Sequence, residues 1–176
     1  MANIENIVPF IKKWEGGFVC DPDDAGGATM SGITYATFCA WRKRKGMPKP
    51  TIGALKNISH TEWMEILKKL YWDKVRADEI VNTKVAILLV DWVWGSGTGI
   101  IKKVQHILGV KEDGIFGPIS LCTLNSKNQA YLYDDIEEAR EIYFRAICAS
   151  RPKNAKFLRG WLNRLHDIRT YTAKML

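Results

Sequence analysis

Residues 14–34 read WEGGFVCDPDDAGGATMSGIT, and this stretch decides how the whole chain is interpreted. A carboxyl residue, Glu15, is followed at once by two glycines and then by a loop rich in aspartate and glycine. Apolar residues recur at helical spacing from Ile4 to Ile11, and Glu15 falls four positions later on the same face. Desolvation on an apolar face and the negative end of a helix dipole both favour a protonated carboxyl group. Glu15 therefore has the surroundings of a general acid; the alternative is a glutamate that only ends the helix in water.

Helical periodicity dominates the remainder, so the predicted fold class is mainly α. We expect a first helix over 3–15, capped by Gly16-Gly17, and a Gly/Asp-rich loop or short hairpin over 16–33. Thr34 and Ser59 are predicted helix N-caps. Further helices are expected from Thr83, Ile100, Pro118, Asn128 and Phe157, and the one from Thr83 is apolar on nearly every side, as a buried central helix would be.

Glycines at 95, 97 and 99 give the best candidate boundary, which predicts subdomains over 1–95 and 96–176. In the last helix Trp161, Leu165 and Ile168 are expected to face inward. Arg164 is expected, like the other arginines of that helix, to face elsewhere.

The composition is that of an ordinary globular protein, with 47% hydrophobic and 26% charged residues in 176. Four scattered cysteines and three scattered histidines make a metal site improbable, and no cofactor is expected. The cysteines are expected to be reduced and mostly buried. The N-terminus carries no recognisable secretory signal, and the longest apolar run is too short to span a bilayer. We therefore expect synthesis in the cytoplasm and a monomer without stable membrane insertion.

The net charge of +7 is concentrated toward the C-terminus, where residues 151–176 carry seven basic side chains and one acidic side chain, Asp167. A basic surface attracts polyanions. Bacterial wall polymers and nucleic acid both qualify, and charge alone does not choose between them.

Several motifs in order resemble the lysozyme-like N-acetylmuramidases of glycoside hydrolase family 108. They are Glu15-Gly16-Gly17, the Asp21-Pro22-x-Asp24-x-Gly26-Gly27-x-Thr29 run, Gly32-Ile33-Thr34, Tyr71-Trp72, Gln105 to Pro118, and Phe157-Leu158-x-Gly160-Trp161-Leu162-x-Arg164. The second half is similar to the small peptidoglycan-binding module that accompanies this family. The resemblance implies a lysozyme-like fold with peptidoglycan, and not nucleic acid, as the partner.

The resemblance implies that Glu15 is the catalytic acid. Asp24 and Thr29 follow it in an order similar to that of phage-type lysozymes, in which Asp and Thr position the attacking water, although Thr29 comes one residue early. The alternative for Asp24 is an Asx turn in the loop. Gln105 to Pro118 is either a glycan-binding element, as the resemblance implies, or a turn-rich connection.

Asp91 interrupts the most apolar helix, where an unpaired carboxylate would be costly. It either lines a substrate cleft or has a structural role, in which it pairs with a buried arginine or caps backbone amides near Gly95. The structural role is favoured. Tyr71, Trp72 and Trp94 are candidate sugar-stacking residues, although aromatic side chains at helical spacing are more often part of the core.

The leading hypothesis is a peptidoglycan hydrolase that cleaves between N-acetylmuramic acid and N-acetylglucosamine. It would be an endolysin of phage or prophage origin that reaches the wall through a holin pore, or an enzyme exported by a non-classical route. The alternatives are a lytic transglycosylase acting on the same bond and a non-enzymatic basic binder of wall polymer or nucleic acid. The binder hypothesis explains neither Glu15 nor the loop that follows it.

Overall fold

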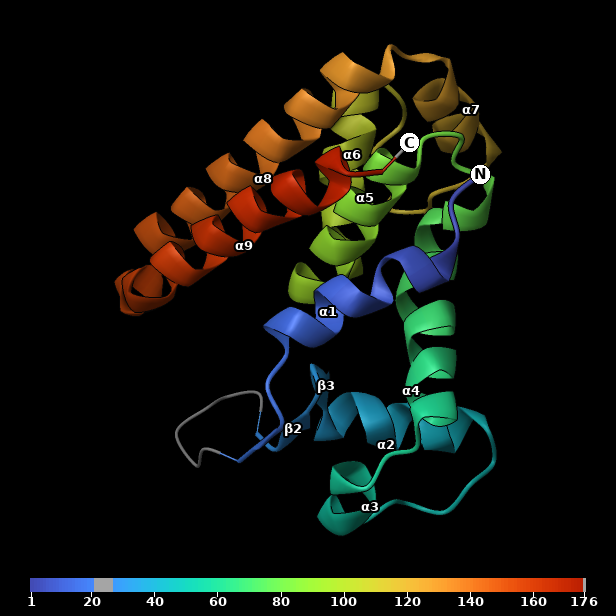
Figure 1. Cartoon of the computed structure of the whole chain (residues 1–176), viewed down its shortest axis with the longest axis vertical. Coiled ribbons are helices and arrows are strands. Elements are labelled where there is room, and N and C mark those ends of the chain that lie inside the picture. Colours follow the sequence, from blue (N-terminus) through green and yellow to red (C-terminus); the bar gives the residue numbers. More distant parts are fainter. Residues whose placement is uncertain (21–26, 176) are drawn as a thin grey trace. The chain divides into compact units, whose positions relative to one another are not determined.

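The structure is a computed structural model that describes residues 1–20 and 27–175, and it is mainly helical with one small sheet (Figure 1). It divides into two compact units, residues 11–68 and residues 1–10 with 69–176. This division by compactness differs from the split at 95/96 expected from the glycines, which stays a prediction. Among the described residues, no helix is long and apolar enough to cross a membrane.

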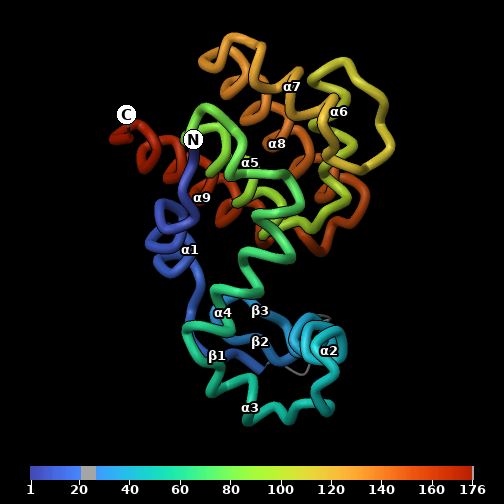
Figure 2. The backbone as a smooth tube through the Cα atoms, turned by 90° about the vertical axis from the view of Figure 1, so that its right-hand side faces the viewer, coloured from blue at the N-terminus to red at the C-terminus, as the bar shows by residue number. Residues whose placement is uncertain are grey.

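The unit of residues 11–68 begins within α1 (Val8–Trp14) and contains a three-stranded antiparallel sheet with three helices. The strands β1 (Phe18–Val19), β2 (Thr29–Met30) and β3 (Ile33–Thr34) lie beside α2 (Tyr35–Arg44) and α3 (Ile52–Lys56), as Figure 2 shows. The last helix of the unit is α4 (His60–Leu67). Ser31 and Gly32 both have positive φ, of 47° and 80°, which is the pattern of a type I′ turn joining β2 to β3. Strands β2 and β3 therefore form a hairpin, whereas residues 21–26 of the expected loop or hairpin lie outside the described residues.

Caps predicted from the sequence are present in this unit. Thr34 accepts a hydrogen bond from the backbone N–H of Thr37 at 3.2 Å, and Ser59 accepts one from that of Glu62 at 3.1 Å. The Trp63 indole donates to the Ser31 carbonyl at 3.0 Å, which ties α4 to the hairpin turn. These bonds fix the short sheet against its helices.

The first helix is shorter and less regular than expected. Residues Ile4–Asn6 form a 3₁₀ turn, η1, and the α-helix begins only at Val8. Pro9 explains the difference, because it has no N–H to continue the α-helical ladder toward residue 5. Gly16 and Gly17 lie outside the left-handed region, so the predicted glycine cap was wrong in its geometry.

The other unit is built around α5 (Thr83–Ser96), which packs against α8 (Gln129–Ser150) and α9 (Ala155–Ala173). Helices α8 and α9 run side by side in Figure 1. Every residue from Val85 to Trp94 on α5 is buried, as the apolar sequence predicted. Asn82 and Asn128 cap α5 and α8, respectively, through their side-chain oxygens.

Shorter elements complete this unit: η3 (Asp73–Val75), η4 (Ala77–Glu79), η5 (Thr98–Ile100), α6 (Ile101–Leu108), α7 (Pro118–Ser126) and η6 (Pro152–Asn154). A single π-helical turn, η2 (Lys68–Trp72), follows directly on α4. The four cysteines are thiols, as expected, but none is buried: Cys20 and Cys122 are exposed, and the other two are half-buried. The expectation that most of them are buried was therefore wrong.

Candidate active site

Glu15 is the first residue after α1. Its backbone N–H donates to the Ile11 carbonyl at 2.8 Å, which completes the last helical turn. The side chain is half-buried, whereas Gly16 and Gly17 are exposed. An added Cβ would meet no atom within 4 Å at either glycine, so nothing in the described residues crowds the backbone beside Glu15. The acid candidate therefore stands at the end of a helix, next to an open stretch of backbone that leads into β1.

Thr29 belongs to the same unit as Glu15, on the central strand of the sheet. It pairs with Val19 of β1 and with Thr34 of β3, and its side chain is half-buried. Its hydroxyl group donates to the Gly27 carbonyl at 3.3 Å. Because a hydroxyl oxygen has two lone pairs besides its one proton, Thr29 can still accept a hydrogen bond from a water molecule. Asp24 lies outside the described residues.

Two of the candidate sugar-stacking residues, Tyr71 and Trp94, lie together in the larger unit. Their ring centroids are 4.6 Å apart and the rings are tilted by 54°. Tyr71 is half-buried in the π-helical turn η2, and Trp94 is 8% exposed. Trp72 differs from both, because it is completely buried and its indole donates to the Asp78 carboxylate at 2.8 Å. Trp72 therefore offers no ring face to a ligand and belongs to the core.

Asp91 is completely buried and holds two arginines. Its carboxylate accepts a hydrogen bond of 2.7 Å from Arg140, and Arg164 binds it through Nη2 at 2.7 Å and Nε at 3.2 Å. Burial acts to raise the pKa of Asp91, but the attraction of the two guanidinium groups and their hydrogen bonds holds that pKa below its ordinary value. The role is structural, as the sequence favoured, and of its two expected forms the structure shows the pairing with arginine. This pairing leaves no carboxylate oxygen for a sugar. The expectation that Arg164 faces away from the core was wrong.

The motif from Gln105 to Pro118 is held together by one buried amide. Gln105 is 1% exposed; its Nε2 donates to Asp113 at 2.8 Å and to the Ile115 carbonyl at 3.0 Å, and its Oε1 accepts from the Gly114 N–H at 2.8 Å. Gly114 has φ of +80°, which explains the glycine. The hydrogen bonds of Gln105 thus explain the motif structurally, because they fix the connection between α6 and α7.

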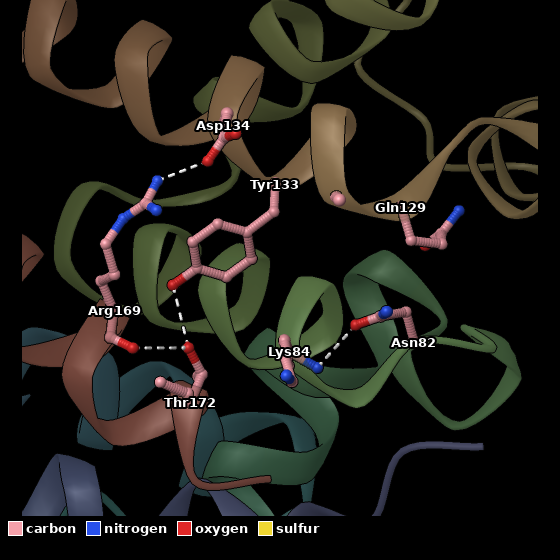
Figure 3. Close-up of a pocket in the computed structure, with 9 residues that line it drawn as sticks. Asn82, Lys84, Gln129, Tyr133, Asp134, Arg169 and Thr172 are labelled. Carbon is pink, nitrogen blue, oxygen red and sulfur yellow. Dashed lines mark hydrogen bonds and ion pairs between the residues drawn. The ribbon is translucent and has the colours of Figure 1, made fainter. Parts of the chain in front are cut away.

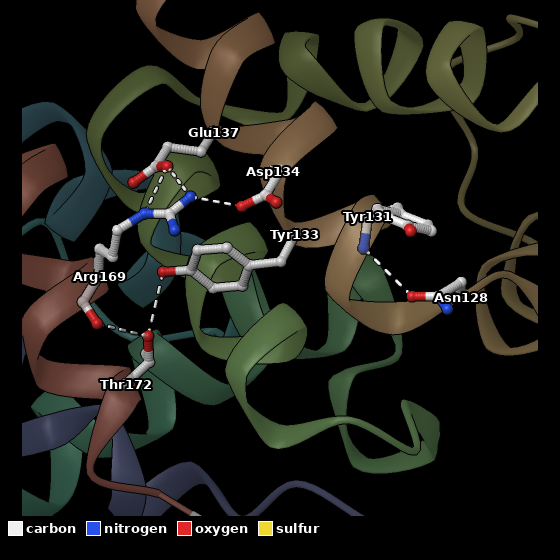
Figure 4. Close-up of polar contacts among 7 residues, drawn as sticks. All are labelled: Asn128, Tyr131, Tyr133, Asp134, Glu137, Arg169 and Thr172. Carbon is white, nitrogen blue, oxygen red and sulfur yellow. Dashed lines mark hydrogen bonds and ion pairs between the residues drawn. The ribbon is translucent and has the colours of Figure 1, made fainter.

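A pocket of about 370 Å³ lies where the N-terminal ends of α5 and α8 meet the last turn of α9 (Figure 3). Its polar side chains mostly bind one another. Tyr133 and Thr172 share a hydrogen bond of 3.0 Å, and Arg169 binds Asp134 at 2.5 Å and also Glu137, as Figure 4 shows. These bonds join α8 to α9, so we assign the polar groups of this pocket to the packing of the unit. No cluster of metal-binding side chains occurs among the described residues.

A mainly helical chain with a short sheet after its first helix is the architecture expected of a lysozyme-like glycoside hydrolase. The comparisons agree with that class. The model of glycosyl hydrolase 108 matches residues 8–97, and that of a predicted peptidoglycan domain matches residues 100–166. Residues 8–97 make up just over half of the chain, and the chain therefore belongs to the glycosyl hydrolase 108 family.

A solved structure, that of Brucella abortus SagA, is similar to this chain with a TM-score of 0.81 and 28% sequence identity. The match covers 94% of this chain and 91% of that one. The search of the curated proteins gave no match. The family and the fold together make this protein a glycoside hydrolase that acts on peptidoglycan.

Proposed function

We propose that the protein is an N-acetylmuramidase that cleaves the bond between N-acetylmuramic acid and N-acetylglucosamine, with Glu15 as the general acid. The observation that carries the proposal is the half-buried Glu15 carboxyl group at the end of α1, inside the region matched by the family model. Glycoside hydrolysis needs a protonated carboxyl group that gives its proton to the leaving oxygen. Glu15 lies beside the exposed backbone of Gly16 and Gly17, where a sugar can reach its carboxyl group.

In this proposal Asp24 and Thr29 position the water that attacks the anomeric carbon. The support for Thr29 is its place on β2, where the sheet holds its backbone between two neighbours. The Thr29 hydroxyl group donates its hydrogen bond to the Gly27 carbonyl. The Thr29 oxygen is therefore proposed to accept a hydrogen bond from the water and not to act as a base. The base would then be Asp24. Tyr71 and Trp94 are the proposed sugar contacts, and lysis of the bacterial wall, as by an endolysin, is the proposed outcome.

The central test is the substitution Glu15→Gln. The amide keeps the shape of the side chain but has no proton to deliver, so we expect the lysis rate of outer-membrane-stripped cells to fall by about 10²–10⁴-fold. Glu5→Gln is the matched control, since Glu5 is an exposed carboxyl residue of the same N-terminal segment. Lysis by the Glu15→Gln variant within a few-fold of the parent would exclude Glu15 as the acid.

Asp24→Asn and Thr29→Ala test the water-positioning pair. Each substitution should slow turnover by about 10²-fold or more, while binding to purified wall sacculi changes little, because water placement matters in the transition state. Rates near that of the parent in both variants would favour the lytic transglycosylase, which needs Glu15 alone.

A further inference from the structure

Positive charge is concentrated on the connection between α8 and α9 and on the first turns of α9. Residues 151–161 read RPKNAKFLRGW, with four basic side chains and no acidic one. Arg151, Lys153, Lys156 and Arg159 are all exposed, and none makes an ion pair with any residue that the structure describes. Some basic residues elsewhere, such as Arg42, Arg145 and Arg169, do bind a carboxylate of the chain. The four basic side chains of residues 151–161 are therefore available to pair with an anionic ligand.

A row of aromatic rings reaches the surface at the same place. Phe144 is 6% exposed on α8, Trp161 is half-buried on α9, and Phe157 is 48% exposed. The ring centroids of Phe144 and Trp161 are 5.3 Å apart, and those of Trp161 and Phe157 are 6.0 Å apart. Lys156 places its ammonium group 4.9 Å from the centre of the Phe157 ring. Exposed rings beside cations form a surface that is both apolar and positively charged.

Gly160 supplies an independent observation. It lies in the interior of α9, where glycine lowers helix stability relative to alanine. An added Cβ at Gly160 would meet no atom within 4 Å, so packing among the described residues does not require a glycine there. Because glycine has no side chain, a ligand can come close to the helix backbone at this position. This bare backbone lies between Phe157 and Trp161 along the helix.

We propose that residues 151–161 are an exosite that holds the glycan strand of peptidoglycan and its stem peptides. A sugar ring rests its apolar side on Phe157 and Trp161 and comes close to the backbone at Gly160. The basic side chains pair with the carboxylates of the stem peptides. The surface binds and does not catalyse, because it contains no carboxyl group. The inference rests on the proposed function, in that it takes peptidoglycan as the substrate.

The first test compares two triple variants in a Glu15→Gln background, which leaves the sacculi uncut during sedimentation. One is Lys153→Gln, Lys156→Gln and Arg159→Gln; the control is Lys74→Gln, Lys127→Gln and Lys174→Gln, three other exposed lysines of the same unit. Both lower the net charge by three, so any difference reports position. Each exposed ion pair is weak, and we expect the first variant to bind sacculi about tenfold more weakly and the control less than threefold.

Equal losses in both variants would overturn the exosite, since binding would then depend on net charge alone. No loss in either would overturn it as well. Displacement from sacculi by a short DNA duplex, lost in the first variant only, would assign the surface to nucleic acid instead. Failure of the proposed function has a separate signature, which is lysis of cells by the Glu15→Gln protein whatever the binding results.

The second test uses Gly160→Leu. Leucine favours the helix, so the melting temperature should stay the same or rise, while the added side chain should weaken sacculus binding at least several-fold even in high salt. Ala149→Leu, at another exposed position near the end of α8, is the matched control and should bind like the parent. Unchanged binding by Gly160→Leu would contradict the close approach of the glycan to the backbone.

Discussion

At the scale of single residues, the clearest outcome concerns two carboxyl groups with opposite surroundings. Glu15 is half-buried at a helix end beside exposed glycines, whereas Asp91 is fully buried between two arginines. A carboxylate clamped by guanidinium groups is held in its charged form and cannot deliver a proton at neutral pH. Asp91 therefore serves the fold, and Glu15 is left as the proposed acid.

Asp91→Asn should destabilise the protein strongly. The substitution leaves Arg140 and Arg164 buried without a counter-charge, and breaking a buried pair in this way typically costs about 3–5 kcal/mol. Urea denaturation followed by circular dichroism measures the loss. Asp134→Asn is the control, because Asp134 is an exposed partner of Arg169, and its loss should cost at most about 1 kcal/mol. Equal effects of the two substitutions would contradict the assignment of Asp91 to the core.

The same cluster predicts a dependence of stability on pH. Because the pKa of Asp91 is lowered in the folded state, its contribution is fully present above the unfolded value of about 4 and is lost as the pH falls through the lower folded value. Unfolding free energy should therefore fall steeply below about pH 4 in the parent and less steeply in Asp91→Asn. Parallel pH profiles would show that other groups cause the acid sensitivity.

At the scale of elements, the sequence predicted the features that depend on residues close along the chain. It missed the contacts between residues that are far apart in the sequence. The caps at Thr34 and Ser59 and the buried α5 follow from local pattern. Arg164 was misplaced because helical periodicity assigns arginine to the surface, and its partner Asp91 lies 73 residues away. For the site, Glu15 could be chosen from its motif, but the burial of Trp72 could not, since nothing local distinguishes a core ring from a sugar platform.

The element from α6 to α7 makes its own prediction. Gln105→Leu removes four hydrogen bonds and leaves the Gly114 N–H without an acceptor, so we expect a loss of about 1–3 kcal/mol in unfolding free energy. Glu112→Gln, in the same loop but exposed, should change stability by less than about 0.5 kcal/mol. Retained stability together with lost sacculus binding in Gln105→Leu would instead favour the glycan-binding interpretation of this motif.

At the scale of the whole molecule, the two compact units do not coincide with the two family matches. The boundary between the matches lies near residue 98, inside one of the units. Helix α5 lies in the catalytic match, yet it packs on α8 and α9. Removal of residues 96–176 would expose the apolar surface of α5, which is why surface substitutions, and not truncation, test wall binding here. The chain passes between the two units at two places, within α1 and within η2.

The most direct measurement of the central claim is mass spectrometry of peptidoglycan digested by the parent enzyme. A muramidase in which Glu15 protonates the leaving oxygen and a positioned water attacks should release fragments with reducing N-acetylmuramic acid ends, one water heavier per cut than anhydro products. The Glu15→Gln protein should release neither kind of fragment. Anhydro-muramic ends from the parent would contradict hydrolysis, and reducing N-acetylglucosamine ends would contradict the assigned bond.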